Sequence, residues 1–189
     1  NAWSKLGIGK CRYGLMLNED GMVYDDGVTT RLNENHYIMT TTTGGAANVL
    51  GKLEDYLQTE WPELNVYLTS VTDHFATASV CGPNSKKILN RLIPDLDLSD
   101  ENFPHMSYKE ALIGKNKCRI MRISFTGEHS YEINVQANYG ESLWEQCIEA
   151  GKEFNITPYG TETMHLLRAE KGFIIVGQDT DGTMTPIDL

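Results

Sequence analysis

The sequence predicts an α+β fold with mainly antiparallel sheets and flanking helices, and two observations support this class. Strand-like segments follow one another across tight turns, which makes them antiparallel neighbours. Helix-like segments interrupt them without the regular strand–helix–strand alternation that a parallel sheet requires. The chain has 189 residues, 40% of them hydrophobic and 22% charged, which suffices for one large domain or two small ones in close contact.

The first half opens with three predicted strands and a helix. Residues 11–17 and 22–32 form a hairpin around a turn at Asn18–Gly21, and a third strand follows at residues 36–41. The run TTTTGG, residues 40–45, then opens a helix. Its apolar residues recur at the spacing of one helical face, which they share: Ala46, Val49, Leu50, Leu53 and Leu57.

Two more strands and a short helix complete this half. The strands are predicted at residues 65–71 and 74–81, and the helix begins after Gly82-Pro83, with Pro83 near its first turn. Residues 94–107 are polar and predict a loop. This loop divides the chain into halves of similar character, residues 1–93 and 108–189.

The second half is predicted to hold a hairpin and two helices. Its strands lie at residues 117–125 and 131–136, with the sequence TGEHS between them. A helix follows at residues 141–154, and Thr161 caps a last helix that stops at Gly172. We expect residues 1–189 to form one domain. Because the first residues lack an initiating Met and the last lack a clear helix end, we also expect a fragment of a longer polypeptide.

Composition excludes several classes of function. The net charge of −10 opposes binding to phosphate backbones, so a nucleic-acid partner is not expected. No apolar run approaches the ~20 residues of a membrane span. The four cysteines are far apart, which argues against a zinc site and a disulfide framework and favours a reducing, cytoplasmic compartment. His129 and Glu132 do not have the spacing of metal ligands, and no metal is expected.

The segment YDDGVTTRL, residues 24–32, places two aspartates inside a predicted strand, where Asp is unusual. Side chains alternate along a strand, so only one of the two faces a given pocket. Asp26 shares the more apolar face, where partial desolvation would raise its pKa and strengthen its attraction to a cation. The alternative is that Asp25-Asp26-Gly27 forms a turn or bulge, and a bulge at Gly27 would exchange the roles of the two acids.

Four segments, in order along the chain, resemble one family. They are RYGLMLNEDGMVYDDGVTTRL, YIMTTTTGG, RISFTGEHSYEINV and LLRAEKGFIIVGQDTDGTMTP. Together they resemble the folate-binding domain of the aminomethyltransferase family, which includes the glycine-cleavage T-protein. Within that family they are most similar to the branch in the alpha subunit of heterotetrameric sarcosine oxidase. The resemblance implies antiparallel sheets arranged around a central folate channel.

The resemblance also implies a function. The imine produced by sarcosine oxidation would react with tetrahydrofolate to give glycine and 5,10-methylenetetrahydrofolate, as one part of an oxidoreductase acting on CH–NH donors. Flavins and NAD would belong to other domains or to partner subunits, and this fragment by itself would not oxidise sarcosine. Three alternatives stay open: a dimethylglycine oxidase or dehydrogenase type of domain, a glycine-cleavage aminomethyltransferase, and a subunit-docking module that retains the fold without the chemistry.

Four site residues follow from this resemblance. Asp26 would lie beside the folate nitrogens and the carbon to be transferred, where it could stabilise positive charge and take a proton. Tyr13 would line the pterin pocket, and Phe125 stands where the family commonly has a stacking Tyr. Glu132 would accept hydrogen bonds from the aminopyrimidine edge of the pterin. The alternatives are a core tyrosine at position 13 and a solvated strand residue at position 132.

Two further candidates have weaker support. Thr42 lies in the TTTTGG run, where hydroxyls and free N–H groups at a helix start can bind a polar ligand edge, although a simple helix cap explains the same residues. Arg168 is the retained arginine of the last helix, and Met164 stands where the T-protein has another arginine. A structural role that ties this helix to its neighbours is an equal alternative for Arg168.

Overall fold

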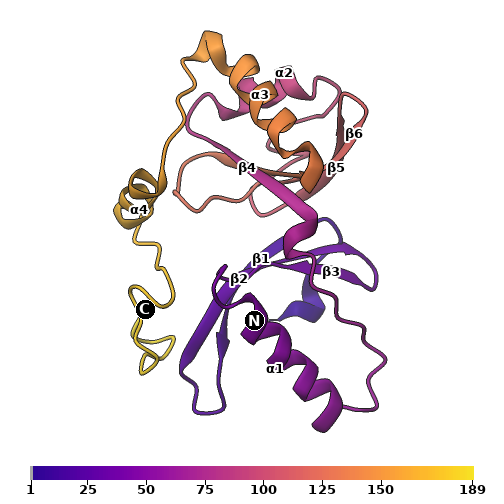
Figure 1. Ribbon diagram of the computed structural model, residues 1–189, viewed down its shortest axis with the longest axis vertical. Helices are drawn as coiled ribbons and strands as arrows, with labels where there is room; N and C mark the ends of the chain where they lie inside the picture. Colours follow the sequence, from indigo (N-terminus) through magenta and orange to yellow (C-terminus); the bar gives the residue numbers. More distant parts are fainter. Residues whose placement is uncertain (1) are drawn as a thin grey trace.

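Two antiparallel sheets form the frame of the protein (Figure 1), and the second takes one strand, Phe75–Cys81, from the first half of the chain. The computed structural model describes residues 2–189. The first sheet has three strands in the order β1-β2-β3, and the second has four in the order β4-β7-β6-β5. All neighbouring strands within them run antiparallel, so the predicted α+β class is confirmed. Within residues 2–189, no helix is long and apolar enough to cross a bilayer.

The first sheet contains the predicted hairpin. Strand β1 (Cys11–Leu17) pairs with β2 (Val23–Asn33), and β3 (His36–Met39) joins the other side of β2. Helix α1 (Ala46–Thr59) follows, and of its predicted apolar face only Val49 is fully buried. In Figure 1 the helix lies beside this small sheet at the bottom of the view, which explains why much of its surface stays open.

The second sheet carries the larger hydrophobic core. One face of this sheet is covered by two helices, and the side chains between them are almost fully buried, including Leu89, Ile133 and Leu143. The strands are β4 (Phe75–Cys81), β5 (Tyr108–Ile113), β6 (Asn116–Met121) and β7 (Ser130–Gln136). The helices are α2 (Ser85–Leu92), α3 (Gly140–Gly151) and the separate α4 (Thr161–Glu170), with 3-10 turns at Trp3–Lys5, Thr72–His74, Ala137–Tyr139 and Lys152–Phe154.

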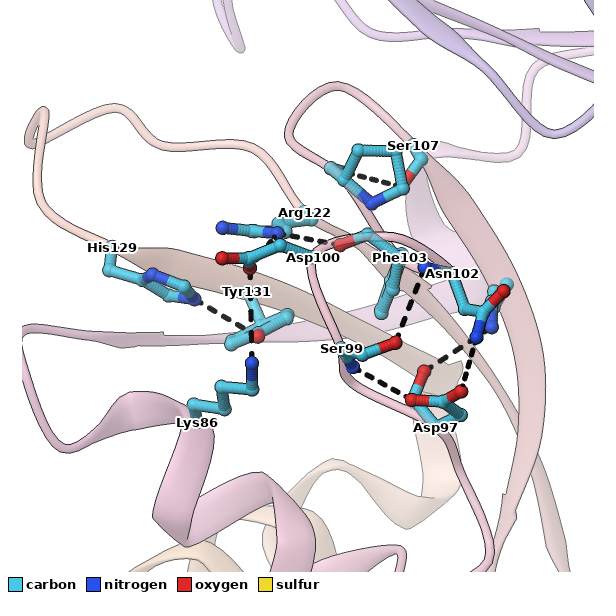
Figure 2. A network of polar contacts seen from close by, with 12 residues as sticks. Lys86, Asp97, Ser99, Asp100, Asn102, Phe103, Ser107, Arg122, His129 and Tyr131 are labelled. Atoms are coloured by element: carbon cyan, nitrogen blue, oxygen red, sulfur yellow. Dashed lines mark hydrogen bonds and ion pairs between the residues drawn. The ribbon is translucent and has the colours of Figure 1, made fainter.

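A network of polar contacts holds the predicted loop of residues 94–107 against the second sheet (Figure 2). Asp100 lies between Arg122 and Lys86, with nitrogen–oxygen distances of 2.8 and 3.8 Å. The same guanidinium donates to the carbonyl of Phe103, whose side chain is fully buried. Beside this network, the His129 ring lies 3.0 Å from the hydroxyl of Tyr131. The loop is therefore fixed by ion pairs and by one buried aromatic ring.

The two sheets meet along a small cluster of buried side chains. The Thr30 hydroxyl lies 3.2 Å from Sγ of Cys11 and 3.7 Å from Sδ of Met121, so β1, β2 and β6 come together at this point. Tyr108 and Ile123 complete the cluster. The face of the first sheet that carries Cys11 and Thr30 is therefore turned toward the second sheet.

Several predicted boundaries are wrong. Residues 65–71 form no strand, because no strand among residues 2–189 pairs with this extended segment. Asn84 is the N-cap of α2, so Pro83 precedes the helix, and Gly160 caps α4 without a side-chain bond from Thr161. The end of the last helix at Gly172, with a φ of 73°, is confirmed.

Strand β5 is an element that the sequence reading missed. The segment YKEALI lies outside the predicted hairpin, yet it pairs with β6 over its whole length. Strand β6 ends at Met121 rather than at Phe125, and α3 gives way to a 3-10 turn after Gly151. Beyond α4, the tail joins the first sheet through a backbone bond from the N–H of Val23 to the carbonyl of Met184.

Candidate functional site

Asp26 and Tyr13 form a hydrogen-bonded pair on the first sheet. They come from neighbouring strands and share one face, and the Tyr13 hydroxyl donates to Oδ2 of Asp26 at 2.8 Å. Burial raises the pKa of Asp26, the bond from Tyr13 acts in the opposite direction, and the nearby charge of Asp25 raises this pKa further. Tyr13 remains 45% exposed. A phenol and a partly buried carboxylate are therefore presented together at an accessible position.

Asp25 is the more buried of the two aspartates, which corrects the expectation that Asp26 occupies the more desolvated face. Only 1% of Asp25 is exposed, whereas Asp26 is partly buried. Oδ1 of Asp25 accepts hydrogen bonds from the backbone N–H groups of Asp26 and Thr42, at 2.7 and 2.9 Å. Oδ2 accepts the Thr42 hydroxyl at 3.1 Å. Asp25 is buried at low cost because these donors replace water.

Gly27 is not a bulge, so the two aspartates do not exchange faces. The β1–β2 register runs unbroken from Cys11–Thr30 to Met16–Asp25, and the irregularity lies beyond Asp25, where β2 has the extra residue Tyr24. Gly27 has a different reason to be glycine. A Cβ at this position would overlap the carbonyl oxygen of Thr40, so only glycine permits this close approach of the chain.

The structure ties Thr42 to Asp25, where the sequence pointed equally to a ligand contact or a helix cap. Its N–H and hydroxyl both donate to Asp25, and its hydroxyl oxygen accepts the N–H of Gly45 at 3.1 Å, immediately before α1. These bonds occupy its polar groups within the protein. The Thr42 side chain, which precedes the helix, therefore caps the start of α1.

Glu132 lies on the polar face of β7, where it was predicted. Its strand neighbours are Ser79 on β4 and Met121 on β6. The carboxylate is partly exposed, and no group among the described residues donates a hydrogen bond to it. Burial alone raises its pKa. Glu132 is therefore a carboxylate largely removed from water without a compensating donor from residues 2–189.

Glu132 pairs with Met121, whose Sδ contacts Thr30 of the first sheet, so Glu132 lies on the face of the second sheet that is turned toward the first. The pKa of the Cys11 thiol is raised to about 11, mainly by burial, and the charge of Glu132 contributes to this increase. Cys11 lies on the same strand and the same face as Tyr13, two residues away. The structure thus turns the Tyr13–Asp26 pair and Glu132 toward the same junction between the two sheets.

Tyr159, which no sequence motif predicts, is affected by the charge of Glu132. Its pKa is raised to about 12, chiefly by burial, with contributions from hydrogen bonding to Cys81 and from the charge of Glu132. It lies in the segment between α3 and α4, outside every motif that the sequence offered. An aromatic residue before a helix start carries no distinctive spacing, so pattern alone gave no signal for it.

Arg168 and Phe125 are not joined to this group by any described contact. Arg168 is 8% exposed and forms an ion pair with Asp179, and it donates to the carbonyl of Phe173 at 3.0 Å. Phe125 is 37% exposed in the β6–β7 loop. That loop packs on the end of α4, because a Cβ at Gly127 would overlap the side chain of Lys171.

Two other observations bear on the choice of site. A search of residues 2–189 for clusters of His, Cys, Asp and Glu that could hold a metal ion finds none. A surface pocket of about 890 Å³ lies further along the second sheet, between Phe75, Arg119 and Asn134, and contains none of the predicted residues. The candidate site therefore rests on the chemistry of the facing side chains and not on the size of a cavity.

Comparison with known proteins agrees with this architecture. The whole chain, residues 1–189, matches the model of the GCVT N-terminal domain. Sarcosine oxidase subunit alpha is 57% identical in Corynebacterium sp. (strain P-1) and 48% identical in Rhizobium meliloti (strain 1021). Each match covers all of this chain but only 20% and 19% of the relative, so the chain spans about a fifth of their length.

A solved structure shows the same fold at lower identity. The glycine cleavage system aminomethyltransferase T from Bartonella henselae superposes with a TM-score of 0.77 and 24% identity. The match covers 97% of this chain and 46% of that protein. On the match of the family model to its whole length, this chain belongs to the family of the GCVT N-terminal domain.

Proposed function

We propose that this chain binds tetrahydrofolate and, as part of an enzyme like sarcosine oxidase subunit alpha, directs the methylene group of oxidised sarcosine onto the folate. The imine and tetrahydrofolate give glycine and 5,10-methylenetetrahydrofolate. In this exchange the two hydrogens lost by the folate nitrogens end on the amino group of glycine. The identity of 57% to sarcosine oxidase subunit alpha supports this choice of substrate over the related aminomethyltransferases, at 31% or below among those compared.

The observation that carries the proposal is that Glu132 is desolvated and accepts no hydrogen bond from residues 2–189. A carboxylate that is withdrawn from water and left without a donor costs free energy, and a ligand that supplies donors recovers it. The aminopyrimidine edge of a pterin presents two N–H groups side by side, which a carboxylate can accept together. Glu132 lies on a rigid central strand, so it would fix the orientation of the pterin.

Asp26 and Tyr13 would act at the other end of the pterin. The Asp26 carboxylate is suited to accept the proton that a folate nitrogen loses and to pass it to the departing glycine. Its negative charge would also stabilise the positive charge of the protonated imine. Tyr13 donates to Asp26 through its hydroxyl, and the exposed part of its ring would pack beside the folate.

Other roles that the family resemblance implies belong to the same proposal. Flavin and NAD would be held by other domains or subunits, and other subunits would be the partners of this chain. Phe125 and Arg168 would contact the folate only if the ligand extends to the β6–β7 loop and α4. A cytoplasmic location is proposed from the four free cysteines.

The first test measures reduced folate binding by calorimetry in the complete protein that carries this chain. We expect Glu132→Ala to weaken binding about tenfold or more, since it removes a charge-assisted pair of hydrogen bonds. Glu128→Ala in the adjacent turn is the matched control and should bind like the wild type. Absence of binding by the wild type would favour the docking-module alternative, and equal binding by all three proteins would remove Glu132 from the site.

The second test follows the product. We expect Asp26→Ala to retain sarcosine-dependent flavin reduction in the assembled enzyme but to divert the product from methylene-folate to formaldehyde, because water then competes for the imine. The two products are quantified in the same reaction. An unchanged ratio of the two products would refute the role of Asp26.

A further inference from the structure

Asp25 has no direct part in the proposed reaction, yet its contacts tie the backbone of Asp26 to the loop of residues 40–45. We infer that Asp25 is a positioning residue, which fixes the backbone of Asp26 and the loop of residues 40–45 so that Asp26 keeps its orientation toward the second sheet. The inference rests on the proposed function of Asp26. It assigns to the first aspartate of the pair a role distinct from the second.

The carboxylate of Asp25 connects two segments that are distant in sequence. Oδ1 receives the N–H of Asp26, 2.7 Å away, and the N–H of Thr42, 2.9 Å away. The first bond restrains the peptide unit from which the Asp26 side chain projects. The second fastens the loop after β3 to the same point, so both segments depend on one oxygen atom.

The second oxygen extends this attachment to α1. Oδ2 accepts the hydroxyl of Thr42 at 3.1 Å, and the oxygen of that hydroxyl accepts the N–H of Gly45 at 3.1 Å. Gly45 is the N-cap residue of α1. A Cβ on Gly45 would overlap Oδ2 of Asp25, so the loop closes on the carboxylate with no space between them. The start of the helix, the loop and the strand therefore form one fixed unit.

Asp25 also acts on Asp26 through its charge. Asp25 and Tyr13 are the titratable groups found to affect Asp26, and they act in opposite directions: Asp25 raises the pKa of Asp26 and Tyr13 lowers it. An amide at position 25 would retain an oxygen for the two N–H groups and lose the charge. The two contributions of Asp25, geometry and charge, can therefore be separated by substitution.

The experiment compares Asp25→Ala with Asp25→Asn in the complete enzyme. The readouts are the ratio of methylene-folate to formaldehyde and the dependence of that ratio on pH, with flavin reduction as the folding control. We expect Asp25→Ala to lower the ratio about tenfold, because Asp26 loses its fixed orientation. Asp25→Asn should recover the ratio to within about twofold of the wild type at pH 8. It should also shift the acidic limb of the profile to lower pH, which lost packing alone would not do.

Gly45→Ala provides a second route in case Asp25→Ala does not fold. It leaves Asp25 in the sequence and displaces its carboxylate, so the ratio should fall as in Asp25→Ala. Gly44→Ala is its matched control, because a Cβ there meets no atom of the described residues within 4 Å. A wild-type ratio in Gly45→Ala or Asp25→Ala would overturn the inference, as would an unshifted acidic limb in Asp25→Asn.

Failure of this inference is distinguishable from failure of the proposed function. If Asp26→Ala leaves the product ratio unchanged, the proposed function of Asp26 fails and the role of Asp25 fails with it. If Asp26→Ala diverts the product while Asp25→Ala does not, only the positioning role is wrong.

Discussion

Asp25 on the first sheet and Glu132 on the second are both carboxylates withdrawn from water, but their surroundings are opposite. Asp25 is 1% exposed and accepts three hydrogen bonds from its own chain. Glu132 is partly exposed and accepts none from the described residues. An acid whose acceptor positions are filled by the protein serves the fold. An acid that is desolvated and still open to a ligand is suited to binding.

The largest effect is expected from removal of the Asp25 carboxylate, whose acceptor positions are occupied by the protein. Asp25→Ala leaves the partly buried N–H groups of Thr42 and Asp26 without their acceptor. We expect hydrogen exchange in the segment spanning residues 23–45 to accelerate about a hundredfold, equivalent to about 3 kcal/mol of local stability. Mass spectrometry of peptides from this segment measures the change.

The control for this prediction is Asp20→Ala, in the turn of the same hairpin. The Asp20 carboxylate accepts no bond from the rest of the described chain, so its removal should leave exchange in residues 23–45 unchanged. Equal acceleration by both variants would show that Asp25 is not special. The statement that the hydrogen bonds of Asp25 stabilise the fold, in contrast to Glu132, would then be wrong.

The first sheet shows what sequence reasoning can and cannot supply. Alternation along residues 22–32 predicted the hairpin and placed the two aspartates on opposite faces, because a strand has a fixed side-chain period. The apolar residues that share a strand face with Asp26 predicted the greater burial for Asp26. The burial of Asp25 comes instead from Thr42 and Gly45, which the chain brings back only after β3. Contacts of this range have no local pattern.

The second sheet gives the complementary case. Glu132 and the polar face of β7 were predicted from the alternation of SYEINV and from the motif around it. Residues 65–71 are also predicted as a strand and form none, because a strand requires a partner and none is present within residues 2–189. The charge of Glu132 affects Tyr159, which lies in a segment with no regular structure. Local patterns therefore place Glu132 on its strand face but give no indication of the segments that surround it.

The second prediction concerns Glu132 and pH. Its pKa is raised in the folded state, so the folded protein binds its proton more tightly than the unfolded chain does. Stability is then highest below the pKa of the unfolded state and falls as the pH rises toward the folded value. We expect Glu132→Gln to stabilise the protein by about 1 kcal/mol at pH 7 and by nothing at pH 4.

Urea unfolding at the two pH values, in the absence of folate, measures this effect. Glu128→Gln in the adjacent turn is the matched control and should change stability equally little at both. If Glu132→Gln destabilises the protein at pH 7, the carboxylate already has a favourable partner, and the contrast with Asp25 is wrong.

The third prediction concerns the hydroxyl of Tyr13. Tyr13→Phe retains the ring and removes the donor that lowers the pKa of Asp26, so Asp26 stays protonated to higher pH. We expect methylene-folate formation to fall about threefold on the acidic side of its profile and little on the alkaline side. Rates measured across pH 5.5–9 test this, with Tyr24→Phe on the same hairpin as the control. A uniform loss at every pH would indicate that Tyr13 acts by packing alone.

The smallest effect is expected at Arg168. This residue separates two properties of a polar group: the absence of a hydrogen-bond partner and accessibility to a ligand. Its Nε is buried and has no hydrogen-bond partner within residues 2–189, and the same holds for the hydroxyls of Ser124 and Thr126. By the absence of partners alone, Arg168 would be a ligand residue like Glu132. Its Nε, however, has almost no accessible surface, and its Nη1 already donates to Asp179 and to the carbonyl of Phe173. A ligand needs access as well as an unpaired atom.

Arg168→Lys tests that distinction, because it retains a cation for Asp179 and deletes Nε. We expect the dissociation constant for reduced folate to change by less than about twofold, since an inaccessible donor contributes nothing to the ligand. Calorimetry on the complete protein measures it, with Asp179→Asn as a second variant that disturbs the same ion pair from the other side. A loss of tenfold or more in Arg168→Lys with wild-type binding in Asp179→Asn would place Nε in contact with the folate. Unpaired polar atoms would then mark ligand contacts in this fold even where solvent cannot reach them.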